Sequence, residues 1–98
     1  MTTARLTMTL DESAAILRDN LAAGSTRIHA ATDYGFVLGE LELERFETDR
    51  RRGLMLDREK AVRAAVEKWV IYSNDAFRTL RPREVQALTC GIESAWSR

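Results

Sequence analysis

The chain has 98 residues, of which 45% are hydrophobic and 31% charged, with 15 basic and 15 acidic side chains. This length and composition predict one domain over residues 1–98 with a modest core, and they exclude a disordered chain. No apolar run reaches the roughly 18 residues of a membrane-spanning helix, so we expect no membrane partner. The single cysteine and the lack of an apolar stretch behind the N-terminus predict a cytoplasmic protein. The formal net charge of zero argues against broad nucleic-acid binding.

The chain begins with a predicted strand and a predicted helix. Residues 4–10 alternate between apolar and polar side chains, which is the period of a half-buried strand. Thr9 and Glu12 have the spacing of a capping box, which predicts a helix start, with Asp11 as a competing N-cap. Apolar residues then recur at helical spacing, and we expect Gly24 to end this helix.

Residues 26–47 can be interpreted in two ways. As strands, residues 26–32 and 36–47 form a hairpin closed by a turn at 33–35, with leucines on one face of the second strand and glutamates on the other. As a helix, residues 36–47 scatter their apolar side chains around the circumference, although a Glu/Leu-rich composition favours a helix. We predict the hairpin.

The second half of the chain predicts two helices. Asp57 caps a helix over residues 58–80, and Pro82 opens another over residues 82–96. The expected fold is α+β, in the order β-α-β-β-α-α, with a three-stranded, mostly antiparallel sheet packed on the helices. If residues 36–52 are helical instead, the fold is all-α. The predicted core residues lie mostly on these two helices and are Trp69, Phe77, Leu80, Leu88, Ile92 and Trp96.

The sign of the charge reverses in the middle of the chain. Residues 33–49 carry six carboxylates against one arginine, and residues 50–63 carry six cations against two carboxylates. Bipolar surfaces of this kind steer and orient partners. On a strand, Glu40, Glu42 and Glu44 would share one face about 6.7 Å apart, near the spacing of nucleic-acid phosphates. This acidic row is a candidate partner site, although a solvated strand face offset by Arg27 is the commoner origin of such a row.

Two other places are candidate partner sites. Arg50, Arg51 and Arg52 can contact phosphate or an acidic protein patch, although a solvated turn more often explains such a run. Ile71 lies about 180° from the apolar stripe of its helix, next to Tyr72. These two residues mark either a contact with a partner or another subunit, or an isolated apolar position on the surface.

The sequence shows no catalytic constellation. His29 is the only histidine and Cys90 the only cysteine, and they lie far apart along the chain. We therefore expect neither a metal site nor a nucleophile–base pair there. Phosphate loops and the common hydrolase motifs are missing. The sequence thus predicts a protein that is not an enzyme and needs no cofactor.

Two segments resemble known families. Residues 80–88, LRPREVQAL, look like the opening helix of a LuxR-type helix-turn-helix domain. Residues 40–69 contain ELELER at 40–45 and RRGL at 51–54, and they are similar to a segment of phage small terminase subunits. In that family a Glu/Leu-rich helix ends in an Arg-Gly turn before a second long helix. The resemblance implies that residues 36–52 are helical.

These observations lead to two functional hypotheses. The first is a non-enzymatic protein that inhibits or regulates a larger protein or protein–nucleic-acid machine, as phage-encoded anti-defence proteins of the anti-CRISPR type do. The second is a nucleic-acid-binding accessory, such as a phage DNA-packaging or transcription factor, which would use the arginine run together with Arg58 and Arg63. Beside these two, a further hypothesis is a dimeric structural module joined through Ile71 and Tyr72. The protein is expected to be a monomer or a homodimer.

Overall fold

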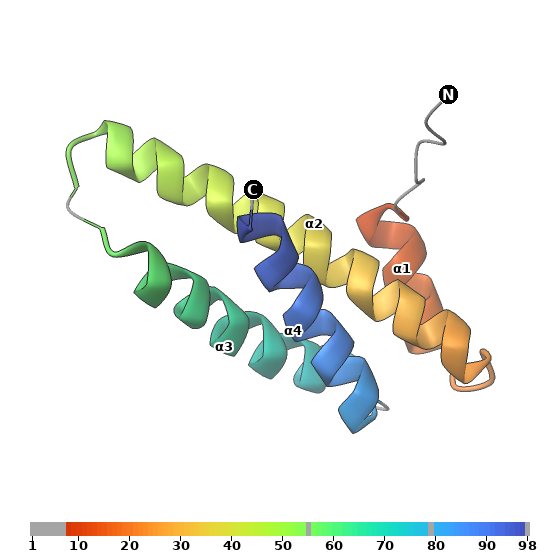
Figure 1. The fold of residues 1–98 in the computed structure, drawn as a ribbon. Helices are drawn as coiled ribbons and strands as arrows, with labels where there is room; N and C mark the ends of the chain where they lie inside the picture. The colour runs from red at the N-terminus through yellow and green to blue at the C-terminus, as the bar shows by residue number, and fades with distance from the viewer. Residues whose placement is uncertain (1–7, 55, 79, 98) are drawn as a thin grey trace.

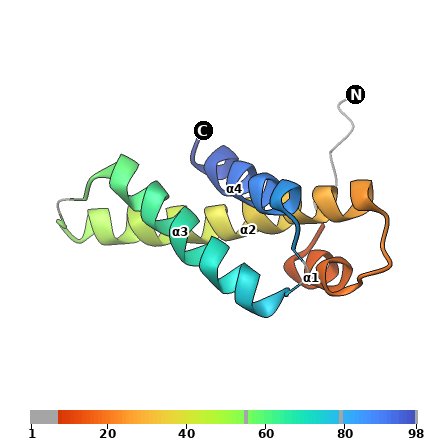
Figure 2. The ribbon, with the colours of Figure 1, turned by 90° about the horizontal axis from the view of Figure 1, so that it is seen from below.

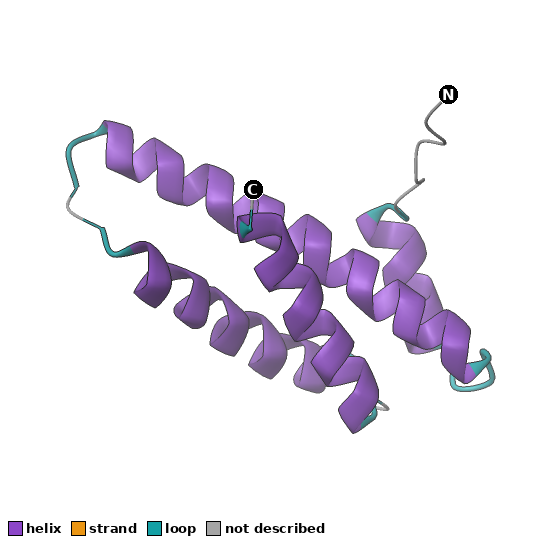
Figure 3. Cartoon of the chain, viewed as in Figure 1, coloured by secondary structure: helices purple, strands orange, loops and turns teal. Residues whose placement is uncertain are grey.

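The computed structural model describes residues 8–54, 56–78 and 80–97, and every regular element in these ranges is a helix (Figure 1, Figure 3). The helices are α1 (Leu10–Arg18), α2 (Gly24–Arg51), α3 (Arg58–Ala76) and α4 (Pro82–Trp96). Helices α2 and α3 form a long antiparallel hairpin, and α4 packs across it (Figure 1). Seen from below, α4 and α1 lie on opposite sides of α2 (Figure 2). Within the described ranges, no helix combines the length and the apolar character that crossing a lipid bilayer requires.

The predicted α+β fold is therefore wrong, and the all-α alternative describes the chain. Residues 26–47, expected as a hairpin, lie inside the single helix α2. Residues 8 and 9 are not a strand, Leu10 already belongs to α1, and the rest of the first predicted strand lies outside the described residues. Gly24 does not end the first helix, because α1 stops at Arg18 and Gly24 is the first residue of α2.

Burial on several sides explains why α2 does not look like an amphipathic helix. It contacts α1, α3 and α4. Its buried side chains accordingly point in several directions and include Ala30, Tyr34, Leu38 and Phe46. A helix that is covered on more than one side needs no single apolar stripe. The scattered apolar residues of 36–47 thus reflect a central helix, not a strand.

The helix ends and the core were predicted more accurately. The Thr9–Glu12 capping box is confirmed, since each backbone N–H bonds the other side chain, at 2.9 and 3.1 Å. Asp57 caps α3 by accepting from the N–H of Glu59 at 3.0 Å, and α4 runs from Pro82 to Trp96 as expected. Helix α3 ends at Ala76, earlier than predicted. Of the six expected core residues, Phe77, Leu88, Ile92 and Trp96 are buried, and Trp69 and Leu80 pack against the core partly buried.

Small residues let α2 and α4 pack at very short range. A Cβ atom on Gly35 would lie 2.2 Å from the carbonyl oxygen of Leu88, and one on Gly91 would lie 2.2 Å from that of Thr32. A Cβ atom on Gly39 would also be too close, at 2.6 Å from the carbonyl oxygen of Ile92 and 2.8 Å from Cβ of Ala95. Gly35, which was expected to lie in a turn, therefore belongs to a close contact between α2 and α4.

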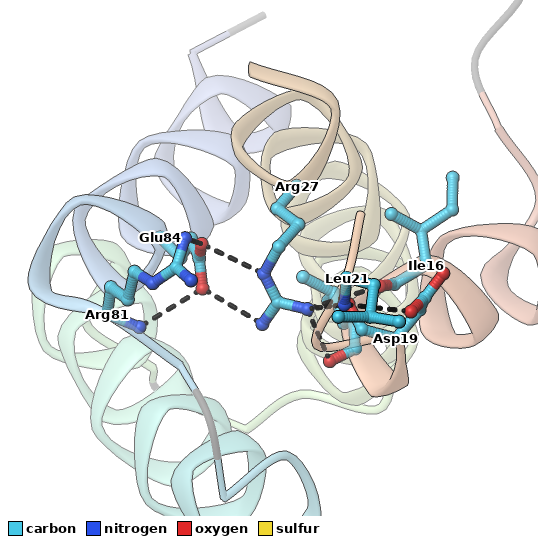
Figure 4. Close-up of polar contacts among 7 residues, drawn as sticks. Ile16, Asp19, Leu21, Arg27, Arg81 and Glu84 are labelled. Carbon is cyan, nitrogen blue, oxygen red and sulfur yellow. Dashed lines mark hydrogen bonds and ion pairs between the residues drawn. The ribbon is translucent and has the colours of Figure 1, made fainter. Parts of the chain in front are cut away.

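A buried ion pair joins α1, α2 and α4 at one end of the molecule (Figure 4). Arg27 Nε and Nη2 donate to the two carboxylate oxygens of Glu84, at 3.0 and 3.1 Å. Nη1 of Arg27 donates to the carbonyl oxygens of Leu17 and Asp19, at 3.1 and 2.6 Å. These carbonyls lie at the C-terminal end of α1, where the helix has no following turn to supply N–H donors. Glu84 in turn accepts from the N–H of Arg81 at the start of α4. The sequence-based expectation that Arg27 is a solvated strand residue is wrong, because only 1% of it is exposed.

Candidate functional site

The three glutamates of the acidic row do not line up, because the strand that would align them is a helix. Successive helical residues are turned by about 100°, so Glu40 and Glu44 share one side of α2 and Glu42 points to another. Glu42 lies 3.2 Å from Nζ of Lys68 and accepts from Nε1 of Trp69 at 3.3 Å. The phosphate-like spacing is thus lost, and Glu42 joins α2 to α3. A role of these carboxylates in partner binding stays a prediction.

The arginine run forms the end of the α2–α3 hairpin. Arg50 and Arg51 occupy the last turn of α2, Arg52 is its C-cap, and all three are exposed. Cationic side chains at this position are favoured by the negative end of the helix dipole. Gly53, with φ of +86°, then turns the chain toward α3. Such a φ favours glycine, which explains the Arg-Gly sequence at this point.

Exposed apolar side chains lie beside these arginines. Leu54 is 53% and Leu56 is 42% exposed. Together with Arg50, Gly53 and Asp57 they line a shallow pocket of about 580 Å³. We call Arg50, Arg51, Arg52, Leu54 and Leu56 the arginine tip. The arginines of this tip were identified from the sequence, but its leucines were missed. Their position directly after the glycine turn at Gly53 could have indicated that they are exposed.

A groove runs along the hairpin behind the arginine tip. It has a volume of about 590 Å³, with Phe46, Ala65 and Trp96 among its lining residues. Three carboxylates and three cations also line it, namely Glu42, Asp49, Asp57, Arg45, Lys60 and Lys68. The charges in the groove therefore balance. At the arginine tip, Arg50 shares its pocket with Asp57, and Arg52 lines a second pocket with Glu44 and Asp49.

Trp96 closes one side of this groove and is held by Arg58. The Arg58 guanidinium lies 5.3 Å from the centre of the Trp96 indole and donates to the Trp96 carbonyl. The indole Nε1 is buried and has no hydrogen-bond partner among the described residues. The ring of Phe46 packs 5.2 Å away, which fixes the indole against α2.

The exposed side of α3 is the third candidate surface. Ile71 is 70% and Tyr72 is 53% exposed, in agreement with the position expected from the helical period. The Tyr72 ring packs edge-on against Trp69 at 5.3 Å. Ile71 lies on the side of α3 opposite its buried residues. We call six exposed residues on this side the outer face of α3, and the first, second and fourth of them also line the edge of the groove: Lys60, Ala64, Glu67, Lys68, Ile71 and Asp75.

The buried titratable groups Tyr34 and Asp33 make structural contacts. Burial raises the pKa of Tyr34, whose ring packs against Phe77 at 5.3 Å. Asp33 is buried, accepts from the N–H of Met8 at 3.1 Å and lies 3.3 Å from Nε2 of His29. Among the residues that the structure describes, no three potential metal ligands come together.

Comparison with known proteins gives no relative. No protein-family model, no curated protein and no solved structure matches this chain. The resemblances to LuxR-type and small terminase segments concern only residues 80–88 and 40–69. Evidence for a function therefore has to come from the charge, exposure and shape of the surface.

Proposed function

We propose that the protein is a non-enzymatic regulator that binds a larger protein, or a protein–nucleic-acid machine, through its arginine tip. The observation that carries this proposal is the combination of three exposed arginines and two exposed leucines at one end of a helical hairpin. Arginine is enriched at protein interfaces, and apolar side chains add affinity once they are covered. The complementary surface is an acidic patch with apolar side chains at its centre.

The distribution of charge supports binding of an acidic partner through the arginine tip. Three consecutive cations, Arg50–Arg52, are exposed together where α2 ends, directly after the acidic stretch of residues 33–49. A local field of this kind raises the rate of encounter with an acidic partner. The exposed single cysteine, Cys90, is compatible with the reducing cytoplasm, where we propose that the protein acts. The narrower expectation of an anti-defence protein stays a prediction.

Affinity capture with matched variants tests the proposal. Arg51→Gln/Arg52→Gln removes two cations from the tip, and Leu54→Ser removes an apolar contact. Arg63→Gln/Arg83→Gln removes two exposed cations elsewhere and serves as the control. The same partner should be recovered by the wild type and the control, and lost with both tip variants. Equal recovery by all four proteins would eliminate the arginine tip as the binding site.

A nucleic-acid-binding accessory is the second candidate, and one observation favours it. The helix, Arg-Gly turn and second long helix that the small terminase resemblance implies are the arrangement of α2, Arg52, Gly53 and α3. In this alternative the tip contacts phosphates, and binding of duplex DNA or RNA should weaken steeply as salt is raised. A gel shift at low salt that disappears in Arg51→Gln/Arg52→Gln would favour this function over the first.

A further inference from the structure

The outer face of α3 is complementary to itself. Its six residues fall within an arc of roughly 100° around the helix, and all are exposed. When two copies of α3 are placed side by side in opposite directions, with the two-fold axis between positions 67 and 68, three kinds of pair arise. Lys60 meets Asp75 of the second copy, Ala64 meets Ile71, and Glu67 meets Lys68.

Every charged position on this face then meets the opposite charge. Each pair also occurs twice, because the symmetry exchanges the two copies. The apolar pair follows the same logic, since the 70% exposed Ile71 would be covered over the smallest non-glycine side chain, Ala64. A parallel arrangement would bring Lys60 against Lys60 and Asp75 against Asp75, which is unfavourable.

We infer that the outer face of α3 binds a second copy of this chain in the antiparallel direction. Ile71 forms the apolar centre of each half of the contact, and the charged pairs set its register. Lys68 can take part without leaving its own fold, since half of its side chain remains exposed while it contacts Glu42. Tyr72, fixed against Trp69 beside this face, adds to its apolar area.

The dimer leaves the arginine tips free and places them far apart. Because α3 begins next to the tip, an antiparallel pair of these 19-residue helices separates the two tips by about 30 Å. A dimer of this kind would present two binding ends to a partner. The inference does not depend on what the tips bind, because self-association is measured on the purified protein alone.

Sedimentation equilibrium over a range of protein concentrations tests this inference. The wild type should dimerise. Ile71→Glu should weaken dimerisation by about 100-fold, because it places a charge at the centre of each half of the contact. Leu21→Glu, which charges an exposed leucine outside this face, is the matched control and should dimerise like the wild type. Circular dichroism should show unchanged helix content in both variants.

A charge exchange tests the register. Lys60→Glu and Asp75→Lys alone should each weaken dimerisation about tenfold, since each creates two like-charged contacts. The double variant Lys60→Glu/Asp75→Lys restores opposite charges and should dimerise like the wild type. A wild type that stays monomeric at all concentrations overturns the inference, and so does a double variant that is as weak as the two single ones.

Discussion

Arg27 shows how one buried side chain can hold three helices. Its guanidinium satisfies the carbonyl groups at the end of α1 while it pairs with Glu84 of α4. An arginine can do this because its planar fork presents several donors in fixed directions. Helix α1 is short and ends without a glycine cap. Arg27 bonds the carbonyl of Leu17 and adds to the backbone hydrogen bonds that the carbonyls of Ile16 and Asp19 already accept.

Removing one partner of this buried pair should therefore be costly. We expect Arg27→Met and Glu84→Met each to lower the free energy of unfolding by about 3–5 kcal/mol, because each leaves an uncompensated buried charge. Urea denaturation followed by circular dichroism measures the loss. The double variant Arg27→Met/Glu84→Met should lose less than the sum of the two single changes. Arg83→Met, at an exposed position of the same helix, is the control. Losses below about 1 kcal/mol in the single variants would contradict this account.

The same pair should make stability depend on pH. Burial alone would raise the pKa of Glu84, but hydrogen bonds and charge from Arg27 and Arg81 outweigh it and hold the pKa below its usual value. A carboxyl whose pKa is lower in the folded state stabilises the fold above the pKa of the unfolded chain. That contribution is lost as pH falls through the folded-state pKa.

We therefore expect the urea midpoint of the wild type to fall as pH is lowered from 7 toward 3. Glu84→Gln, which cannot titrate at this position, should start from a lower midpoint and change less over the same range. Glu12 also has a lowered pKa, owing to its hydrogen bonds with Thr9, and its contribution remains in both proteins. An identical pH profile for the two proteins would show that Glu84 contributes nothing to acid sensitivity.

At the scale of the helices, the sequence predicted best the elements that are buried on one side. Helix α4 and the capped starts of α1 and α3 follow from capping residues and from apolar residues at helical spacing. Helix α2 was missed because neighbours cover it on several sides, so that no single face marks it as a helix. Its alternating Glu and Leu residues at 40–44 then imitate the period of a strand.

For the candidate surfaces, too, only the local features could be predicted from the sequence. The arginine run and Ile71 could be identified, because a charge cluster and a helical period are local properties of the sequence. The complementarity of Lys60 with Asp75 requires knowing that α3 is a helix with this face exposed. Contacts across helices, such as Arg27 with Glu84, carry no local signal in one sequence.

The glycines of the α2–α4 contact should respond to alanine in the opposite direction from helix propensity. Alanine in a helix is usually favoured over glycine by about 1 kcal/mol. We expect Gly91→Ala and Gly39→Ala instead to lower the free energy of unfolding by about 1–3 kcal/mol, since the added methyl group collides with backbone of the other helix. Gly24→Ala is the matched control, because nothing lies within 4 Å of its Cβ position. Thermal and urea unfolding measure the difference, and a stabilising Gly91→Ala would contradict the close approach.

The whole molecule is flat, with extents of 47 × 40 × 19 Å. Its thickness corresponds to about two helix diameters, so a large share of α3 faces solvent. Only Ala65 and Ser73 are buried in α3, whereas α4 buries six of its residues. The tightly packed α2–α4 pair is the stable centre of the fold, and the hairpin end with its arginine tip projects from it.

This difference in burial should appear in amide hydrogen exchange. At low protein concentration, amides of α2 and α4 near Gly35 and Gly91 should exchange slowest. Those of residues 58–64, the first two turns of α3, should exchange fastest among helical amides, because no side chain there is buried. Mass spectrometry of peptides from the exchanged protein resolves the two regions. Raising the protein concentration should slow exchange in α3 alone if its outer face binds a second copy. Uniform protection of all four helices at low concentration would contradict this prediction. It would mean that α3 is as stable against local unfolding as α4.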